Sequence, residues 1–239
     1  MSERRGHLAE MAKNFDNPEI KFLFSEGRER HFKMGEHLIT EGQATDYFYD
    51  LLSGTVALAR NGRDGRRQIL SFMGARQFLG AASTPGYPNL ATALTDVKAI
   101  CYPRAALERA LATTPGLASE FRVVLTRILE SSHDHIYTIG QRSAVERVAS
   151  FLLYLRSNQA RFAVEGPREK SELIDLPMTR LDIADFLGLT IETVSRAFSS
   201  LKKMEAIGFT DSHSCTILNI QRIRDLGGRE DFTAHRGSN

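Results

Sequence analysis

The chain has few cysteines and no obvious metal-binding cluster. Its 239 residues include only two cysteines, Cys101 and Cys215, which lie far apart in the sequence. A secreted disulfide framework needs several paired cysteines, and zinc sites and iron–sulfur clusters usually take four ligands from one chain. His133 and His135 lie two positions apart on a predicted helix, so their side chains do not share a face and make a poor metal pair. We therefore predict no metal and no cofactor.

The chain also lacks an excess of charge of one sign and a long apolar run. It has 31 basic and 29 acidic residues, and this balance excludes a polybasic nucleic-acid binder. Its longest apolar run, at 149–155, is far shorter than the roughly 20 residues that cross a bilayer, and no signal peptide is visible. No nucleophile–base set indicates an enzyme. We expect a cytoplasmic protein without a membrane partner, in which a few well-placed side chains would have to carry any DNA binding.

The first half of the chain has the pattern of an antiparallel β domain. Turn pairs containing glycine recur at short intervals between residues 32 and 102, and strand-like runs fill the gaps between them. Two of these runs flank residues 62–65, which we predict to be a hairpin tip. The pattern predicts a barrel or sandwich over about residues 32–102, followed by a short helix at 104–112.

A long helix is predicted over 115–140. Its apolar stripe follows heptad spacing with a polar position near the middle, and consists of Phe121, Leu125, Ile128, Ser132, His135 and Ile139. Two interpretations are open, a helix that lies on its own β domain and a helix that pairs with a second copy. The length of the stripe favours the dimer.

The segment 178–209 carries the functional signal. Thr179 with Asp182 three residues later resembles a capping box, and Gly188 is a suitable residue to end the first helix. Thr190 then caps a second helix, and Val194 falls on its buried face. Two short helices joined by a turn containing glycine predict a helix-turn-helix.

The exposed face of the second helix can read DNA bases. Arg196 can donate to guanine, Glu192 can accept from cytosine N4, and Ser195 can add a secondary contact. We expect Glu192 to orient Arg196 as an i, i+4 pair, with a plain surface salt bridge as the alternative. The predicted phosphate contacts are Thr179, Arg180, Thr190 and Thr193.

These features together resemble the cAMP-receptor/FNR (Crp/Fnr) family of bacterial transcription regulators. The resemblance covers about residues 20–225 and is carried by Gly-Glu at 35–36, Glu-Gly at 41–42, Phe48 with Leu-Leu-Ser-Gly at 51–54, Val-Glu-Arg-Val-Ala at 145–149, and the segment 179–196. It implies an α+β fold. A jelly-roll β-roll, like a cyclic-nucleotide-binding domain, would occupy 1–114, a dimerisation helix 115–140, a winged helix-turn-helix domain 141–226, and a flexible tail 227–239.

The resemblance also implies partners and contacts. The run Glu-Thr-Val-Ser-Arg at 192–196 is similar to the motif of branches that read a TTGAT-N4-ATCAA palindrome as homodimers. It assigns Glu192, Ser195 and Arg196 to base contacts, and Ile191 can add a contact to a thymine methyl. An activator is favoured over a repressor, and the implied contact with RNA polymerase is the hairpin at Asp64, Gly65 and Arg66.

The sensor half departs from two branches of the family. Cyclic-nucleotide binders pair the phosphate with an arginine, but no arginine lies between Gln77 and Arg104. The iron–sulfur branch uses N-terminal cysteines, and residues 1–50 contain none. The resemblance is therefore to the FixK-like branch, and it implies control of low-oxygen respiration, denitrification or nitrogen fixation without cAMP or a cluster. An effector-gated regulator with an unidentified β-roll ligand, and a signalling module that no longer binds DNA, remain alternatives.

The two cysteines have different expected environments. Cys101 lies in an apolar run and is expected in the core. Cys215 lies in the segment 212–220, where the wing after the recognition helix is expected. We favour a strand cysteine of no consequence, and the alternative is a redox switch whose oxidation beside DNA weakens binding.

Overall fold

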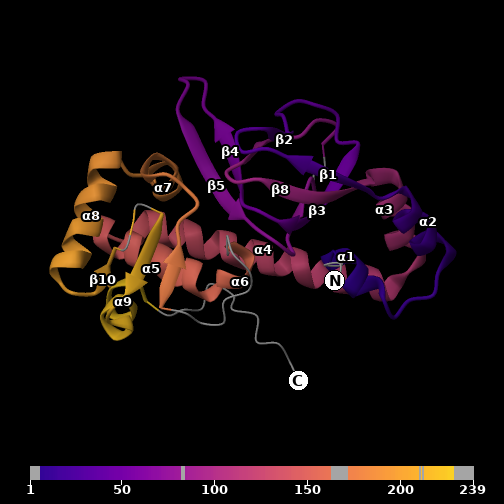
Figure 1. The fold of residues 1–239 in the computed structure, drawn as a ribbon. Coiled ribbons are helices and arrows are strands. Elements are labelled where there is room, and N and C mark those ends of the chain that lie inside the picture. Colours follow the sequence, from indigo (N-terminus) through magenta and orange to yellow (C-terminus); the bar gives the residue numbers. More distant parts are fainter. Residues whose placement is uncertain (1–5, 82–83, 163–171, 210, 212, 229–239) are drawn as a thin grey trace. The chain divides into compact units, whose positions relative to one another are not determined.

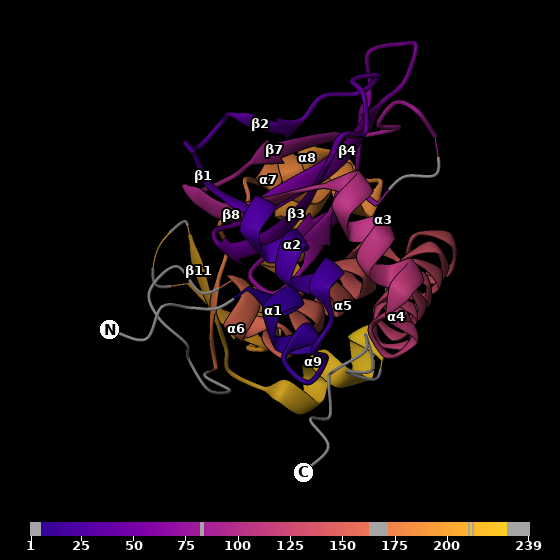
Figure 2. The same cartoon turned by 90° about the vertical axis from the view of Figure 1, so that its right-hand side faces the viewer.

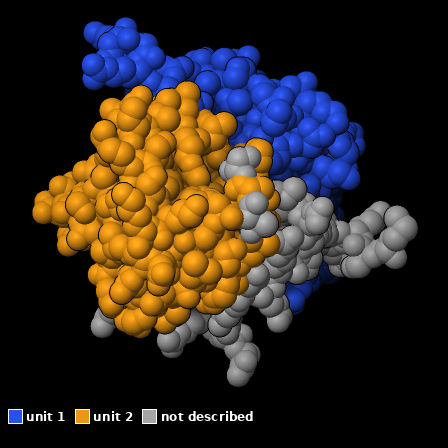
Figure 3. Space-filling view, turned by 60° about the vertical axis from the view of Figure 1, so that its left-hand side comes forward, with its two compact units in different colours: residues 1–125 blue, residues 126–239 orange. Residues whose placement is uncertain are grey.

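The structure of the protein is a computed structural model that describes residues 6–81, 84–162, 172–209, 211 and 213–228. Residues 229–239 of the predicted tail lie outside this range. The chain divides into two compact units, Met1–Leu125 and Thr126–Asn239, which Figure 3 shows in two colours. Each unit has its own fold and its own core.

The described part of unit 1 contains two antiparallel sheets of four strands each (Figure 1). The strand order of one sheet is β1 (Arg28–Phe32), β8 (Val97–Pro103), β3 (Tyr47–Ser53) and β6 (Phe78–Leu79). The order of the other is β2 (His37–Ile39), β7 (Leu90–Ala93), β4 (Val56–Asn61) and β5 (Arg67–Met73). Leu51 of the first sheet and Val56 and Ala91 of the second are fully buried in one core cluster. The two sheets thus enclose a common core, which confirms the predicted β-roll.

The hairpin between β4 and β5 is strongly basic. Asn61 pairs with Arg67 at its last rung, and Gly65 takes a positive φ of 79° in the turn, a conformation that glycine adopts without strain. Arg60, Arg63 and Arg66 are exposed. The turn therefore lies where the sequence predicts it, and it presents several guanidinium groups to solvent.

Helices cover the sheet that contains β3 and β8 (Figure 2). They are α1 (His7–Ala12), α2 (Pro18–Glu26), α3 (Arg104–Thr113) and the first part of α4 (Pro115–Gln141). A second core cluster joins Leu8, Leu23 and Leu117 of these helices to Phe48 and Phe78 of the sheet. The first two helices were not predicted from the sequence.

A buried carboxylate anchors α1. Asp50 of β3 is fully buried, and its Oδ2 accepts a hydrogen bond from the backbone amide of Leu8 at 2.9 Å. Burial raises the pKa of Asp50 to about 6, while the backbone amides of Leu8 and His7 act in the opposite direction. Asp50 therefore supplies a hydrogen-bond acceptor to the first turn of a helix far away in the sequence.

Unit 2 contains the second part of α4 followed by a winged helix-turn-helix. Its further helices are α5 (Ala144–Ser157), α6 (Gln159–Phe162), α7 (Arg180–Leu187), α8 (Ile191–Lys203) and α9 (Ile220–Gly227). A small antiparallel sheet has the order β10 (Ile207–Gly208), β11 (Ser214–Ile217) and β9 (Leu173–Asp175). The capping box of Ser143 and Glu146 starts α5 and separates it from α4. Among the described residues, no helix combines the length and hydropathy required to span a bilayer.

Candidate nucleic-acid interface

The helix-turn-helix is formed by α7 and α8. Thr179 and Asp182 form the capping box at the start of α7, with the Asp182 amide donating to Thr179 Oγ1 at 3.1 Å and the Thr179 amide donating to Asp182 Oδ2 at 2.9 Å. Gly188 ends α7 in the left-handed conformation, with a φ of 62°. Thr190 then caps α8 by accepting from the Thr193 amide at 3.2 Å. These local signals are the ones that the sequence predicts.

The recognition helix α8 has one buried face and one exposed face. The buried face packs against α5 and α7 and consists of Val194, Ala197, Phe198 and Leu201. The structure places all four predicted base-reading residues on the exposed face, namely Ile191, Glu192, Ser195 and Arg196. Two charged groups of opposite sign, a hydroxyl and an apolar side chain therefore face solvent together along the first turns of one helix.

Hydrogen bonding at the start of α8 differs from the expected Glu192–Arg196 pair. Arg196 Nη2 donates instead to Thr193 Oγ1 at 3.1 Å, and this hydroxyl lies 2.9 Å from Thr190 Oγ1. The pKa of Glu192 is lowered mainly by hydrogen bonds at its own backbone amide and at Thr190, and only weakly by Arg196. The Glu192 carboxylate is therefore ionised at neutral pH, and Thr193 orients the guanidinium.

Arg180 has a different environment from the one expected of a phosphate contact. Its guanidinium carbon lies 3.8 Å from the ring centroid of Phe198 and 5.2 Å from that of Phe209. Burial lowers the pKa of Arg180. The side chain thus packs on the rings as a cation–π contact, and it would have to leave them to bind a phosphate. Nothing in the local sequence pattern signals this contact.

Both thiols are buried. Cys215 in β11 has no exposed surface, and burial raises its pKa to about 12 although the nearby Arg180 acts in the opposite direction. Residue 212 of the predicted wing segment lies outside the described residues. Cys101 in β8 is buried in the β-roll core, and burial raises its pKa to about 11. Neither thiol forms appreciable thiolate at neutral pH, and the burial of Cys215 favours the interpretation without a redox role.

The predicted stripe on α4 does not lie on one free face. Phe121 is buried within unit 1, where its ring lies 5.6 Å from that of Phe48. His135 stacks on Phe186 within unit 2, and Ile139 is half-buried. Leu125, Ile128 and Ser132 are exposed. The other large apolar side chains exposed on α4 are Val123, Leu129, Ile136 and Tyr137. Heptad spacing alone does not separate the stripe residues that pack inside their own unit from those that are exposed.

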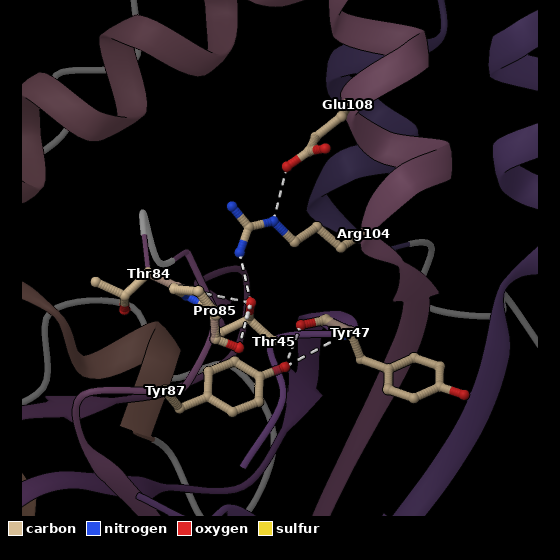
Figure 4. Close-up of polar contacts among 7 residues, drawn as sticks. All are labelled: Thr45, Tyr47, Thr84, Pro85, Tyr87, Arg104 and Glu108. Carbon is tan, nitrogen blue, oxygen red and sulfur yellow. Dashed lines mark hydrogen bonds and ion pairs between the residues drawn. The ribbon is translucent and has the colours of Figure 1, made fainter. Parts of the chain in front are cut away.

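The stretch between Gln77 and Arg104, where cyclic-nucleotide binders carry an arginine, is held by hydrogen bonds to other parts of unit 1 (Figure 4). Thr45 Oγ1 donates to the Thr84 carbonyl at 3.1 Å, and Arg104 Nη1 donates to Thr45 Oγ1 at 2.8 Å. Arg104 Nε also donates to Glu108 at 2.7 Å, and the Tyr87 hydroxyl donates to the Tyr47 carbonyl at 2.6 Å. No sequence pattern predicts this network.

A cavity of about 460 Å³ lies beside this network in unit 1. Its apolar lining comes from Phe48, Leu107, Leu111 and Phe121, and Arg104 and Glu108 supply the charged groups. Since Arg104 pairs with Glu108, its charge is already balanced without a ligand.

A β-roll, a long helix and a winged helix-turn-helix with an exposed recognition face define a transcription regulator with a DNA-binding domain. Residues 29–114 match the family described as a cyclic nucleotide-binding domain, and residues 146–226 match the Crp-like helix-turn-helix domain. The chain belongs to the Crp/Fnr family of transcription regulators.

The chain is similar to FixK regulators over nearly its whole length. It is 35% identical to the nitrogen fixation regulation protein FixK of Bradyrhizobium diazoefficiens, over 95% of this chain and 96% of that protein. It is 37% identical to the transcriptional activatory protein AadR of Rhodopseudomonas palustris, over 74% and 73%. The structure of FixK2 from Bradyrhizobium japonicum superposes with a TM-score of 0.76 and 31% identity, covering 85% of this chain and 98% of that chain. These relatives are named as regulators and not as enzymes.

Proposed function

We propose that the protein is a homodimeric activator that binds a TTGAT-N4-ATCAA-like palindrome. The observation that carries this proposal is the exposed face of α8, where Ile191, Glu192, Ser195 and Arg196 share one surface above a fully packed inner face. The N-terminal part of a recognition helix is the part that meets base edges in the major groove. Arg196 donates to guanine, Glu192 accepts from cytosine N4, Ser195 adds a secondary contact, and Ile191 contacts a thymine methyl.

Phosphate contacts flank these bases. The hydroxyls of Thr190 and Thr193 lie at the N-terminus of α8, where backbone amides and the helix dipole also favour an anion. Thr179 is exposed at the corresponding end of α7. Arg180 contacts a phosphate only if it exchanges its aromatic partners for the DNA, so we expect it to contribute less than the threonines.

The second copy would pair along α4. Leu125, Leu129 and Ile136 are exposed on this helix, and with Ser132 they follow a 4, 3, 4 spacing that suits a two-stranded coiled coil. This stripe replaces the one predicted through Phe121 and His135, whose side chains are used inside their own units. Two recognition helices about 34 Å apart would then read the two halves of the palindrome.

The names of the relatives support an activator of the FixK-like branch. They include FixK, AadR and the transcriptional activator protein FnrL of Cereibacter sphaeroides. We infer control of low-oxygen respiration, denitrification or nitrogen-fixation genes in the cytoplasm, without cAMP or an iron–sulfur cluster. The absence of an arginine between Gln77 and Arg104, and of cysteine in residues 1–50, supports this independence.

The β4–β5 hairpin is the proposed contact with RNA polymerase, at Asp64, Gly65 and Arg66. Arg66 pairs with Asp64 at 3.3 Å, whereas Arg60 and Arg63 add further exposed positive charge. An acidic polymerase surface would complement this hairpin.

Fluorescence anisotropy of the reduced protein tests the DNA-binding proposal. The palindrome and a scrambled duplex are compared at fixed salt without a ligand. We expect tight binding to the palindrome and a loss of selectivity in Arg196→Ala. Lys203→Ala is the matched control, because this exposed cation lies at the far end of the same helix. If the wild type and Arg196→Ala regulate a reporter equally well, the alternative of an interaction module replaces this proposal.

The cavity in unit 1 favours a second candidate, an effector-gated regulator. Its volume of about 460 Å³ lies within the range of small-molecule sites. This candidate predicts weak DNA binding until an effector is added, so tight and selective binding by the protein alone would exclude it.

A further inference from the structure

The end of α4 contacts the first helix of the helix-turn-helix through an aromatic stack. The His135 ring lies parallel to the Phe186 ring of α7, with centroids 4.1 Å apart and an angle of 13° between the planes. The Phe186 ring also lies 5.7 Å from the ring of Phe151 in α5, and Phe186 is only 8% exposed. Phe186 thus connects α4 and α5 to α7.

A second contact holds the same end of α7. Arg147 of α5 donates from Nη1 to the Leu187 carbonyl at 2.9 Å, and from Nε to the Arg142 carbonyl at 2.9 Å. Leu187 is the last residue of α7, where helix carbonyls lack partners within the helix, and Arg142 lies just beyond α4. One guanidinium therefore joins the junction after α4 to the turn of the helix-turn-helix.

The chemistry of His135 suits a packed, uncharged role. Burial lowers its pKa to about 4, although a hydrogen bond to the backbone of Phe186 acts in the opposite direction. The imidazole is therefore neutral at physiological pH and stacks on Phe186 as an aromatic ring. His133, two residues earlier on the same helix, is exposed. Two histidines on one helix thus have different surroundings, and His135 is the one that stacks on α7, the first helix of the helix-turn-helix.

We propose that His135 and Arg147 are positioning residues that fix α7, and with it the recognition helix α8, relative to the end of α4. This inference rests on the proposed DNA-binding dimer. Since the two copies would pair along α4, the orientation of α8 relative to this helix decides whether both recognition helices reach their half-sites together. A loosened contact lowers the fraction of molecules competent to bind, and the apparent Kd rises in the same proportion.

The size of the effect follows from the contacts. An aromatic pair of this geometry corresponds to roughly a two- to tenfold change in an equilibrium constant. Removing the Arg147 side chain leaves two carbonyl groups without their charged donor, so we expect a loss of at least tenfold there.

The test compares four variants of the full chain. His135→Ala removes the stack, His135→Phe keeps an aromatic ring on Phe186, Arg147→Lys removes the guanidinium that donates to two carbonyls, and His133→Ala is the matched control. We expect His135→Ala to weaken binding to the palindrome by about two- to tenfold at pH 7.5. His135→Phe should bind within about twofold of the wild type, and His133→Ala should be unchanged. Sedimentation equilibrium should show the same dimer in all four.

The outcomes separate this inference from the proposed function. If the wild type fails to select the palindrome, the proposed function fails. If the wild type selects it and folded His135→Ala binds equally well while melting at a lower temperature, His135 is merely structural and the inference is wrong. If His135→Ala does not fold, His135→Phe and Arg147→Lys decide instead. His135→Phe should then bind within about twofold of the wild type, and Arg147→Lys should bind at least about tenfold more weakly. If His135→Phe binds as weakly as Arg147→Lys, or if Arg147→Lys binds as the wild type does, the inference is overturned.

Discussion

The buried carboxyl of Asp50 makes the stability of unit 1 depend on pH. Its pKa is about 6 in the folded protein, against 3.8 for a free aspartate, and burial is the main cause. The folded state therefore holds this proton more tightly than the unfolded state, and stability falls as pH rises between these two values. Above pH 6 the full difference costs about 3 kcal/mol of unfolding free energy.

Asp50→Asn removes this charge while keeping an oxygen for the Leu8 amide. The new amide nitrogen needs an acceptor, but that penalty is the same at every pH. The informative quantity is thus the change in ΔΔG between two pH values. The wild type recovers about 2 kcal/mol of this cost when the pH falls from 7.5 to 4.5. We therefore expect the unfolding free energy of Asp50→Asn to rise by about 2 kcal/mol relative to that of the wild type between pH 4.5 and 7.5.

Urea denaturation followed by circular dichroism at both pH values measures this difference. Asp96→Asn is the control, because this exposed carboxylate has a pKa lowered by its hydrogen bond from Lys33, and its loss should not stabilise the protein at pH 7.5. If the relative stability of Asp50→Asn is the same at pH 4.5 and 7.5, Asp50 does not titrate as a buried acid and the reasoning is refuted.

Three further predictions concern the DNA-binding domain. Arg196→Ala should weaken binding by roughly 1–3 kcal/mol at guanine-containing half-sites and relax specificity there; an equal loss on scrambled DNA would contradict base reading. Cys215→Ser should leave DNA binding by the reduced protein intact. Because the thiol is fully buried, we expect it to resist a thiol reagent until urea is added, and rapid labelling of the native protein would restore the redox interpretation. Gly188→Ala should destabilise unit 2 by about 1 kcal/mol in thermal melts, since alanine is strained at a φ of 62°; an unchanged melting temperature would show that the turn relaxes.

The helix-turn-helix was predictable because its signals are local. The capping box at Thr179, the turn at Gly188 and the cap at Thr190 each depend on residues within four positions of one another. The periodicity of α8 also separates its inner face from its outer one, so the exposure of Arg196 follows from the position of Val194.

Features that depend on distant neighbours could not be predicted in this way. Heptad spacing placed Phe121 and His135 on a common stripe, but it carries no information about Phe48 or Phe186, which cover them. Helix geometry likewise suggested that Glu192 holds Arg196, whereas the hydroxyl of Thr193 takes the guanidinium. The aromatic partners of Arg180 come from α8 and from the strand region after it, well beyond any local pattern.

The division of α8 into two faces has an evolutionary consequence. The residues that pack the domain, such as Val194 and Leu201, are distinct from those that meet DNA, such as Glu192 and Ser195. Substitutions at exposed positions usually change stability by no more than about 0.5 kcal/mol. The DNA sequence that is preferred can therefore change among descendants of this chain while the fold stays the same. A duplicated gene can acquire a new set of promoters through substitutions at only a few solvent-exposed residues.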